Sequence, residues 1–142
     1  MTDSAAVPQT RPADSPLTAD SLEISLTVAA VRPSAAWYRD TLGFTIEREF
    51  ERGGRLFAIR LRAGAVRILL TQDDGAKGAD RAKGEGFSFQ ITSPQPIDGL
   101  AARAKQAGAV LDLEPVDAFG ARIFRLRDPD GFRIAVSSPR ET

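Results

Sequence analysis

The stretch RDPDGFRIAVSS, Arg127–Ser138, joins a sharp turn directly to a strand and so indicates how the chain completes its fold. Pro129 presets the backbone angle of the turn, and Gly131 supplies a positive φ that other residues adopt only with strain. From residue 132 to residue 137, apolar side chains alternate with polar or small ones, which is typical of a strand with one buried face. The stretch therefore predicts the closing hairpin of a β-rich unit.

The elements before this hairpin follow an order that the first half of the chain also shows. In residues 86–138 a strand, GFSFQIT, precedes a helix, PIDGLAARAKQAG, and three strands, VLDLEPV, ARIFRLR and FRIAVSS. In residues 22–72 the strand LEISLTV, the helix RPSAAWYRDTLG and the strands FTIEREF, RLFAIRLR and VRILLTQ keep that order. A polar, glycine-rich linker, 73–85, separates the two modules. The sequence predicts an α+β fold in which two βαβββ modules form a curved, mixed, largely antiparallel sheet groove with the helices on its outer face.

Glycines and apolar spacing set the expected boundaries of these elements. Gly53–Gly54 and Ala63–Gly64 predict hairpin turns, and Gly43 and Gly108 predict the ends of the two helices. The side chains expected to face the core from the helices are Val31, Ala35, Tyr38, Leu42, Ile97, Leu100, Ala101 and Ala104.

Composition limits the partners and the location of the protein. Residues 1–21 carry Pro8, Pro12 and Pro16 among small polar residues, which predicts a disordered tail before a single domain over residues 22–138. The 19 lysines and arginines balance the 19 acidic residues, so nothing favours a nucleic acid or a membrane as a partner. No apolar run approaches the roughly 20 residues that span a bilayer, and the N-terminus lacks the features of a signal peptide. We expect a cytoplasmic protein.

Two residue types that carry much of protein chemistry are missing from this chain. It contains no cysteine and no histidine. The first absence excludes disulfides, thiolate metal sites and cysteine nucleophiles. The second removes the commonest metal ligand and the commonest base at neutral pH, and with it the usual serine triad.

Two motifs on this architecture resemble those of the vicinal oxygen chelate superfamily. They are AWYRDTLGF, Ala36–Phe44, and FRLRDPDGF, Phe124–Phe132. Members of that superfamily include glyoxalase I, extradiol dioxygenases, and the bleomycin and fosfomycin resistance proteins. The resemblance covers about residues 22–138 and implies the paired-module fold. It implies little about activity, because the fold serves isomerases, dioxygenases, epimerases and binding proteins.

The resemblance also implies where the metal-using members would place their ligands. These four positions correspond to Glu23, Leu69, Gly86 and Ala135. Among these side chains, Glu23 alone offers a ligand for a cation, and one carboxylate does not make a site. The turn departs from the family further, with Phe132 where asparagine is usual. We therefore expect neither a metal nor another cofactor.

Strand alternation predicts which side chains line the groove. Small, hydrogen-bonding and arginine side chains suit a small organic ligand, although each of them could simply face water. The arginines could also form cross-strand pairs with Glu47, Glu49 or Asp112. The resemblance adds Phe119, placed like an aromatic that packs a flat ligand in bleomycin-binding members, although a loop phenylalanine could equally cover the core edge. The candidate ligand-binding residues are Ser25, Thr27, Arg60, Arg67, Leu69, Ser88, Gln90, Phe119, Arg133 and Ala135.

Three function hypotheses follow, in order of preference. The first is a metal-free binding protein like the bleomycin-resistance branch, a homodimer that sequesters a flat organic compound such as an antibiotic. Arginines in the groove favour a neutral or anionic compound. The second is a metal-independent isomerase, epimerase or lyase with Glu23 as general base and arginines stabilising an oxyanion. A metal enzyme of the glyoxalase or dioxygenase type ranks third, because the sequence lacks its ligands.

Overall fold

The computed structural model describes residues 15–78 and 81–141. Each module contributes one strand, a helical segment and three further strands, as the sequence predicts. The elements of the first module are β1 (Glu23–Val28), α1 (Val31–Trp37), the π-helical turn η2 (Tyr38–Leu42), β2 (Thr45–Arg52), β3 (Arg55–Ala63) and β4 (Val66–Gln72). Those of the second are β5 (Ser88–Thr92), α2 (Ile97–Gln106), β6 (Leu111–Ala118), β7 (Ala121–Arg127) and β8 (Arg133–Ser137).

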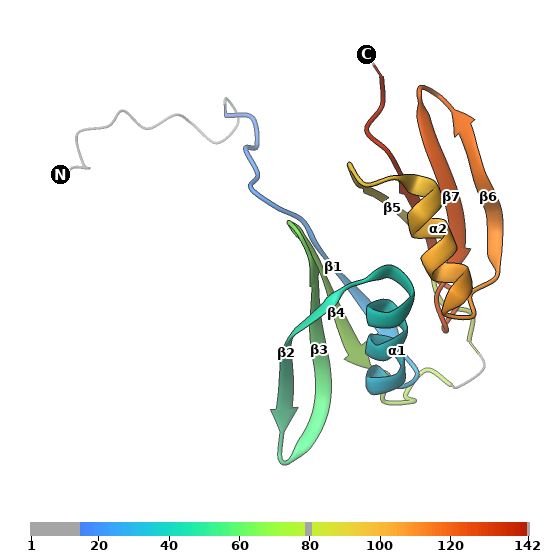
Figure 1. The fold of residues 1–142 in the computed structure, drawn as a ribbon. Coiled ribbons are helices and arrows are strands. Elements are labelled where there is room, and N and C mark those ends of the chain that lie inside the picture. The colour runs from blue at the N-terminus through green and yellow to red at the C-terminus, as the bar shows by residue number, and fades with distance from the viewer. Residues whose placement is uncertain (1–14, 79–80, 142) are drawn as a thin grey trace.

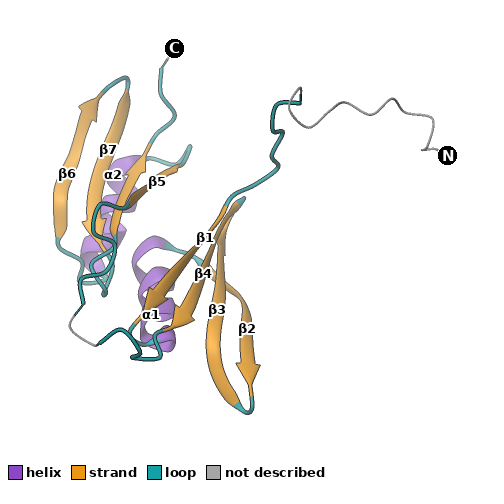
Figure 2. Cartoon of the chain, turned by 180° about the vertical axis from the view of Figure 1, so that it is seen from behind, coloured by secondary structure: helices purple, strands orange, loops and turns teal. Residues whose placement is uncertain are grey.

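The strands form two four-stranded sheets, ordered β1-β4-β3-β2 and β5-β8-β7-β6. In each sheet the strand that begins the module pairs in parallel with the strand that ends it, β1 with β4 and β5 with β8. The remaining pairs are antiparallel. Helices α1 and α2 lie on the same side of the sheets, toward the viewer in Figure 1 and behind the strands in Figure 2. The prediction of an α+β fold built from two βαβββ modules is confirmed. Within this chain the strands make two mixed sheets rather than one continuous sheet.

The first helix is less regular than its sequence suggests. The sequence predicts one helix up to Gly43, whereas the structure has an α-helix to Trp37 and then a π-helical turn from Tyr38 to Leu42. Gly43 ends the turn at φ +84°, in the left-handed region where a glycine is favoured. A side chain here would also meet the Arg103 guanidinium, 3.4 Å from an added Cβ. The predicted glycine cap is confirmed, and the π turn is a finding that periodicity did not indicate.

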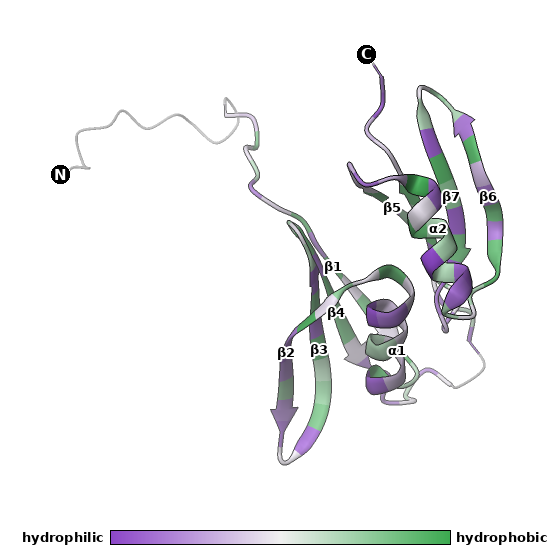
Figure 3. Ribbon diagram, in the orientation of Figure 1, coloured by the Kyte–Doolittle hydropathy of each residue, from purple (hydrophilic) through white to green (hydrophobic). Residues whose placement is uncertain are grey.

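One hydrophobic core joins the two modules. Apolar residues alternate with polar ones along several strands of both sheets, as the bands of Figure 3 show. The helical residues predicted to be buried pack in or against this core, with Leu42 and Leu100 only partly covered. The largest fully buried side chains come from both halves: Tyr38, Leu26, Ile59, Leu61, Ile68, Leu70, Phe124, Leu126 and Ile134.

The two sequence motifs meet at a buried hydrogen bond. The Tyr38 hydroxyl donates to a carboxylate oxygen of Asp128, 2.7 Å away, and both side chains are buried. The other Asp128 oxygen accepts the backbone N–H groups of Asp130 and Phe132, each at 2.9 Å. Burial raises the pKa of Asp128 even though these bonds act in the opposite direction, and burial together with the nearby carboxylate raises the pKa of Tyr38. The turn thus fixes the second module onto the first helix.

A lysine from the linker completes this junction. The Lys83 ammonium lies 2.9 Å from a carboxylate oxygen of Asp73 and 3.2 Å from one of Asp130, and all three side chains are largely buried. The same Asp130 oxygen accepts the backbone N–H of Ala29 at 2.8 Å. We call the group Tyr38, Asp73, Lys83, Asp128 and Asp130 the inter-module latch. It joins the linker, the end of the first sheet and the 128–131 turn.

Two boundary predictions need comment. The hairpin between β3 and β4 turns at Gly64–Ala65, one residue later than predicted, because Ala63 still pairs with Val66. Of the predicted tail, residues 1–14 lie outside the described residues, and residues 15–22 form neither helix nor strand. None of the helices within residues 15–78 and 81–141 has the length and apolarity required to cross a membrane.

Candidate functional site

The candidate residues of the first module form one strip on the sheet face away from α1. Strand register places Ser25 of β1 beside Leu69 of β4, and Leu69 beside Arg60 of β3. The next row toward the latch contains Thr27 beside Thr71, with their hydroxyl oxygens 3.3 Å apart. Parallel pairing of β1 with β4 therefore brings together side chains that lie more than forty residues apart in the chain.

The charged residues of this strip are paired with one another. The Arg60 guanidinium donates to both carboxylate oxygens of Glu23, at 2.6 and 3.4 Å, and the two side chains remain about one-third exposed. This ion pair raises the pKa of Arg60. Arg67 donates to Glu47 at 3.2 Å, which is one of the cross-strand alternatives that the sequence leaves open. Hydrogen bonding to Arg67 lowers the pKa of Glu47.

A β-bulge adds two residues that sequence reasoning missed. The pairing of β2 with β3 shifts by one residue between Ile46 and Arg48, so that Arg48 and Phe50 join the face of Arg60. Strict alternation from Ile46 would have pointed both toward the helix. The guanidinium carbons of Arg48 and Arg60 lie 4.8 and 5.3 Å from the centre of the Phe50 ring. The run of charge and apolar residues in FTIEREF gives no local signal for this shift.

The candidate residues of the second module form a matching strip on the other sheet. Ser88 pairs with Arg133 and Gln90 with Ala135 between the parallel strands β5 and β8. The Gln90 amide donates to the hydroxyl of Ser137 at 2.8 Å. The strip continues onto β7, where Arg125 lies beside Ala135. This face therefore repeats the small, polar and arginine composition of the first.

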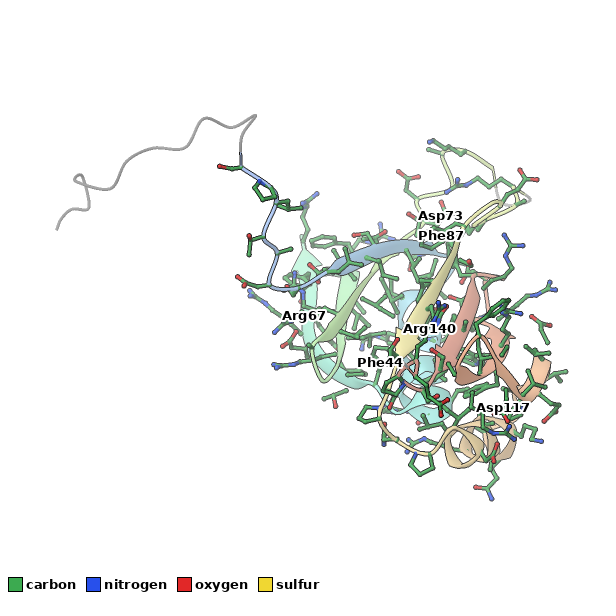
Figure 4. The ribbon with its side chains drawn as sticks, turned by 90° about the horizontal axis from the view of Figure 1, so that it is seen from above. Phe44, Arg67, Asp73, Phe87, Asp117 and Arg140 are labelled. Carbon is green, nitrogen blue, oxygen red and sulfur yellow. The ribbon has the colours of Figure 1, made fainter. Side chains whose placement is uncertain are left out.

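The remaining candidate, Phe119, lies apart from both strips. It sits at the tip of the β6–β7 hairpin with 87% of its surface exposed and a positive φ of 53°, which is uncommon outside glycine. Figure 4 shows Asp117, two residues before it, across the molecule from Arg67 of the first strip. Within one chain this ring does not join the candidates on the strands.

A shallow hollow of about 290 Å³ borders the first strip. Its wall contains Ser25 and Thr27 together with linker residues and the rings of Phe87 and Phe132. Phe132 packs so closely on Gly84 that an added Cβ there would lie 2.6 Å from the ring, which requires glycine at this position. The two strips belong to different sheets, and the wall of this hollow contains candidates from the first strip but none from the second.

The side chains at the centre of each strip do not suit a metal. Register makes Ser25 and Gln90 the cross-strand neighbours of Leu69 and Ala135, whereas Gly86 precedes β5. These neighbours offer one hydroxyl and one amide, without an ionisable ligand. Among residues 15–78 and 81–141, no three His, Cys, Asp or Glu side chains gather where they could hold a metal ion.

Comparison with known proteins gives a family and a fold. The model of the Glyoxalase/Bleomycin resistance protein/Dioxygenase superfamily matches residues 21–136. No curated protein matches significantly in sequence.

Solved structures resemble this one over most of their length. A glyoxylase/bleomycin resistance protein/dioxygenase domain from Frankia sp. EAN1pec shares 23% identity at a TM-score of 0.71, covering 88% of this chain and 95% of that one. TnmS3, an antibiotic binding protein from Streptomyces sp. CB03234, shares 16% identity at a TM-score of 0.68, covering 86% and 97%. TioX from Micromonospora sp. ML1 shares 17% identity at a TM-score of 0.67, covering 84% and 98%. At these identities the likeness concerns the fold.

Proposed function

The chain belongs to the Glyoxalase/Bleomycin resistance protein/Dioxygenase superfamily, and from this premise we propose that it binds and sequesters a flat organic compound without a metal. The observation that carries the proposal is the composition of the two strips. At their centres Ser25 and Leu69 pair across one sheet, and Gln90 and Ala135 pair across the other. Such side chains can orient a ligand by hydrogen bonds and apolar contact, but they cannot polarise it as a metal would.

The charges on the strips support an anionic or neutral ligand. Arg48 and Arg60 flank the face of Phe50 in the first module, and Arg125 and Arg133 lie on the corresponding face of the second. Guanidinium planes and a phenyl ring stack on flat molecules and hold carboxylate or phenolate oxygens at their edge. A cationic compound would find the Glu23 and Glu47 carboxylates of the first strip already paired with Arg60 and Arg67.

The ion pair between Glu23 and Arg60 favours binding over catalysis. Arg60 occupies one lone pair on each Glu23 oxygen, so a substrate that gave its proton to Glu23 would have to approach a carboxylate that is already hydrogen-bonded to a guanidinium. A substrate that drew Arg60 away would free the Glu23 carboxylate. The alternative function is therefore a metal-independent isomerase, epimerase or lyase, and the test below distinguishes it from sequestration.

We further propose that a homodimer completes the groove. The two strips lie on separate sheets. Phe119 extends from its hairpin into solvent, away from the other candidate residues. A second copy whose β6–β7 hairpin reached a strip would supply the missing wall and a use for the exposed ring. Sedimentation of the full chain tests whether the protein is a dimer. A strictly monomeric protein that still binds the aromatic anion used below would contradict this proposal.

The test uses a flat aromatic anion, anthracene-2-carboxylate, with cationic 2-aminomethylanthracene for comparison. Fluorescence titration should show tighter binding of the anion. Replacing Arg60 or Phe50 by alanine should weaken it about tenfold, because a charge-assisted contact or a stacked ring is lost. Arg32→Ala, which removes an exposed arginine paired with Glu49 on another part of the surface, is the matched control and should leave the titration unchanged.

Two further measurements decide between binding and turnover. Mass spectrometry should recover each bound compound unchanged after prolonged incubation with the protein. Conversion that Glu23→Gln abolishes would overturn sequestration in favour of the enzyme. Stoichiometric metal in the purified protein, with chelator-sensitive turnover, would overturn both.

A further inference from the structure

A second cavity lies between the two modules, on the helix side of the sheets. Its volume is about 670 Å³, within the range of sites that hold drug-sized molecules. Its wall combines the β3–β4 turn, the start of β2, the segment after β5 and one face of α2. In Figure 4 Phe44, one of its lining residues, lies near the middle of the molecule. The apolar part of the wall is made by Leu42, Phe44, Val66, Ile91, Leu100 and Phe124.

This cavity is separate from the candidate groove. Ile91, Phe124 and Val136 line it, and strand alternation points these side chains to the face opposite Gln90 and Ala135. None of the predicted ligand-binding residues belongs to its wall. A ligand held against these side chains would lie on the face opposite the centres of the strips, and of the described residues that share the strips' parity only Arg62, Thr45 and Thr92 contribute to the wall.

Charge on the wall has one sign. Arg62 and Arg103 are the charged residues that line the cavity, and no acidic residue lines it. Arg62 is already engaged, since it donates to the carbonyl of Gly64 at 2.9 Å and to Glu47 at 3.4 Å. Arg103 is different, because one nitrogen donates to the carbonyl of Arg39 at 3.2 Å and no carboxylate lies within ion-pair distance among residues 15–78 and 81–141.

The Arg103 guanidinium is also held in place. It packs over Gly43, whose missing side chain leaves the space that the guanidinium occupies. A guanidinium has five N–H donors in a fixed plane, so one bond to Arg39 leaves donors that can take a carboxylate in a bidentate manner. Threonine, serine and glutamine side chains at Thr45, Thr92, Ser93 and Gln95 add hydrogen-bonding groups to the same wall.

We propose that this inter-module cavity is a second ligand site, which takes an amphipathic organic anion. The apolar body of the ligand lies against Phe44, Val66 and Leu100, and its carboxylate pairs with Arg103. Because the wall combines residues of both modules, the ligand bridges them at the end of the molecule that the latch does not hold.

The probe is dodecanoate below its micellar concentration, added to the full-length protein. Its flexible chain does not suit a site for flat rings, which separates this test from that of the proposed function. Calorimetry should give one dodecanoate per chain, with dodecanol much weaker and dodecyltrimethylammonium without binding. Backbone amide NMR shifts should move around Ala65, Ser93 and Arg103 rather than on the outward face of β1 and β4.

Two variants test the site by different routes. Arg103→Ala should weaken dodecanoate binding about ten- to a hundredfold, the loss expected for one charge-assisted contact. Ala65→Trp places a large side chain at an exposed turn position in the wall and should block binding without disturbing the core. Arg32→Ala again serves as the matched control.

The proposal fails in any of three results. They are an absence of dodecanoate binding, equal binding of the cationic detergent, and unchanged affinity in both variants. Dodecanoate shifts confined to the Ser25 and Leu69 strip would also overturn it, and would assign the anion to the groove of the proposed function. Loss of anthracene-2-carboxylate binding in Arg60→Ala with dodecanoate binding intact would show that the two sites are independent.

Discussion

The two ends of the junction between the modules are built in opposite ways. At the end where β4 finishes and β8 begins, the inter-module latch closes the junction with buried hydrogen bonds and ion pairs. At the end where β4 begins and β8 finishes, the junction opens into the 670 Å³ cavity with an apolar wall and two arginines. In Figure 4 Asp73 of the first end and Phe44 of the second are well separated.

This difference separates stability from binding. Every buried side-chain polar atom in the described residues has a hydrogen-bond partner, so the latch end contributes to holding the fold together. At the open end the cavity is unfilled, and the Arg103 guanidinium makes a single hydrogen bond within the described part of the chain. This end therefore has fewer packing contacts but has room and free donors for a ligand. Changes at the latch should therefore lower the free energy of unfolding, and changes at the open end should alter binding instead.

The largest effect is expected for Asp128→Ala. The substitution removes the acceptor of two backbone N–H groups and of the Tyr38 hydroxyl in a buried place. We expect the free energy of unfolding to fall by about 3 kcal/mol, because each orphaned buried donor costs about 1 kcal/mol or more. Urea denaturation measures it. A loss below about 1 kcal/mol would mean that the latch does not hold the modules together.

The next effect is expected for Lys83→Met, which leaves Asp73 and Asp130 facing each other without the cation between them. Removing one partner from a largely buried ion pair should lower the free energy of unfolding by about 2 kcal/mol. Lys77→Met, at an exposed linker position, is the control and should change stability by less than about 0.5 kcal/mol. Equal effects of the two variants in urea denaturation would contradict the role given to Lys83.

At the open end Arg103→Ala should change the free energy of unfolding by less than about 0.5 kcal/mol, because the side chain is exposed and makes a single hydrogen bond. The same variant should lose dodecanoate binding. Measuring both quantities on one sample sharpens the contrast between the ends. A large loss of stability would place Arg103 among the structural residues.

The smallest effect concerns pH. A hydrogen bond from the Gly75 backbone and, after it, one from Lys83 lower the pKa of Asp73 below its ordinary value of 3.8. A depressed folded-state pKa contributes stability above the unfolded pKa, and this stability is lost as pH falls through the folded value. The raised pKa of Asp128 acts in the opposite direction, since the folded state then takes up its proton first. Asp73→Asn should therefore flatten the fall of stability below about pH 4 in acid denaturation.

The local pattern of the sequence determined most of the fold. Period-two alternation in strands such as β1 and β8 and glycines such as Gly43 sufficed to predict the elements and their order. These signals are local, because each depends on residues that are neighbours in the chain. Alternation also placed Ser25 and Leu69 on the same face, but their pairing across β1 and β4 was found only in the structure.

Tertiary structure decided what depends on distant residues. The bulge in β2 moved Arg48 and Phe50 to the outward face, since pairing with β3 and not local propensity sets that register. The linker lysine, Lys83, is an ordinary polar residue in sequence, and only the meeting of Asp73 with Asp130 makes it a buried cation. The partners of Glu23 and Arg103, and the cavity between the modules, likewise arise from packing, because a cavity is a property of surfaces that no single segment carries.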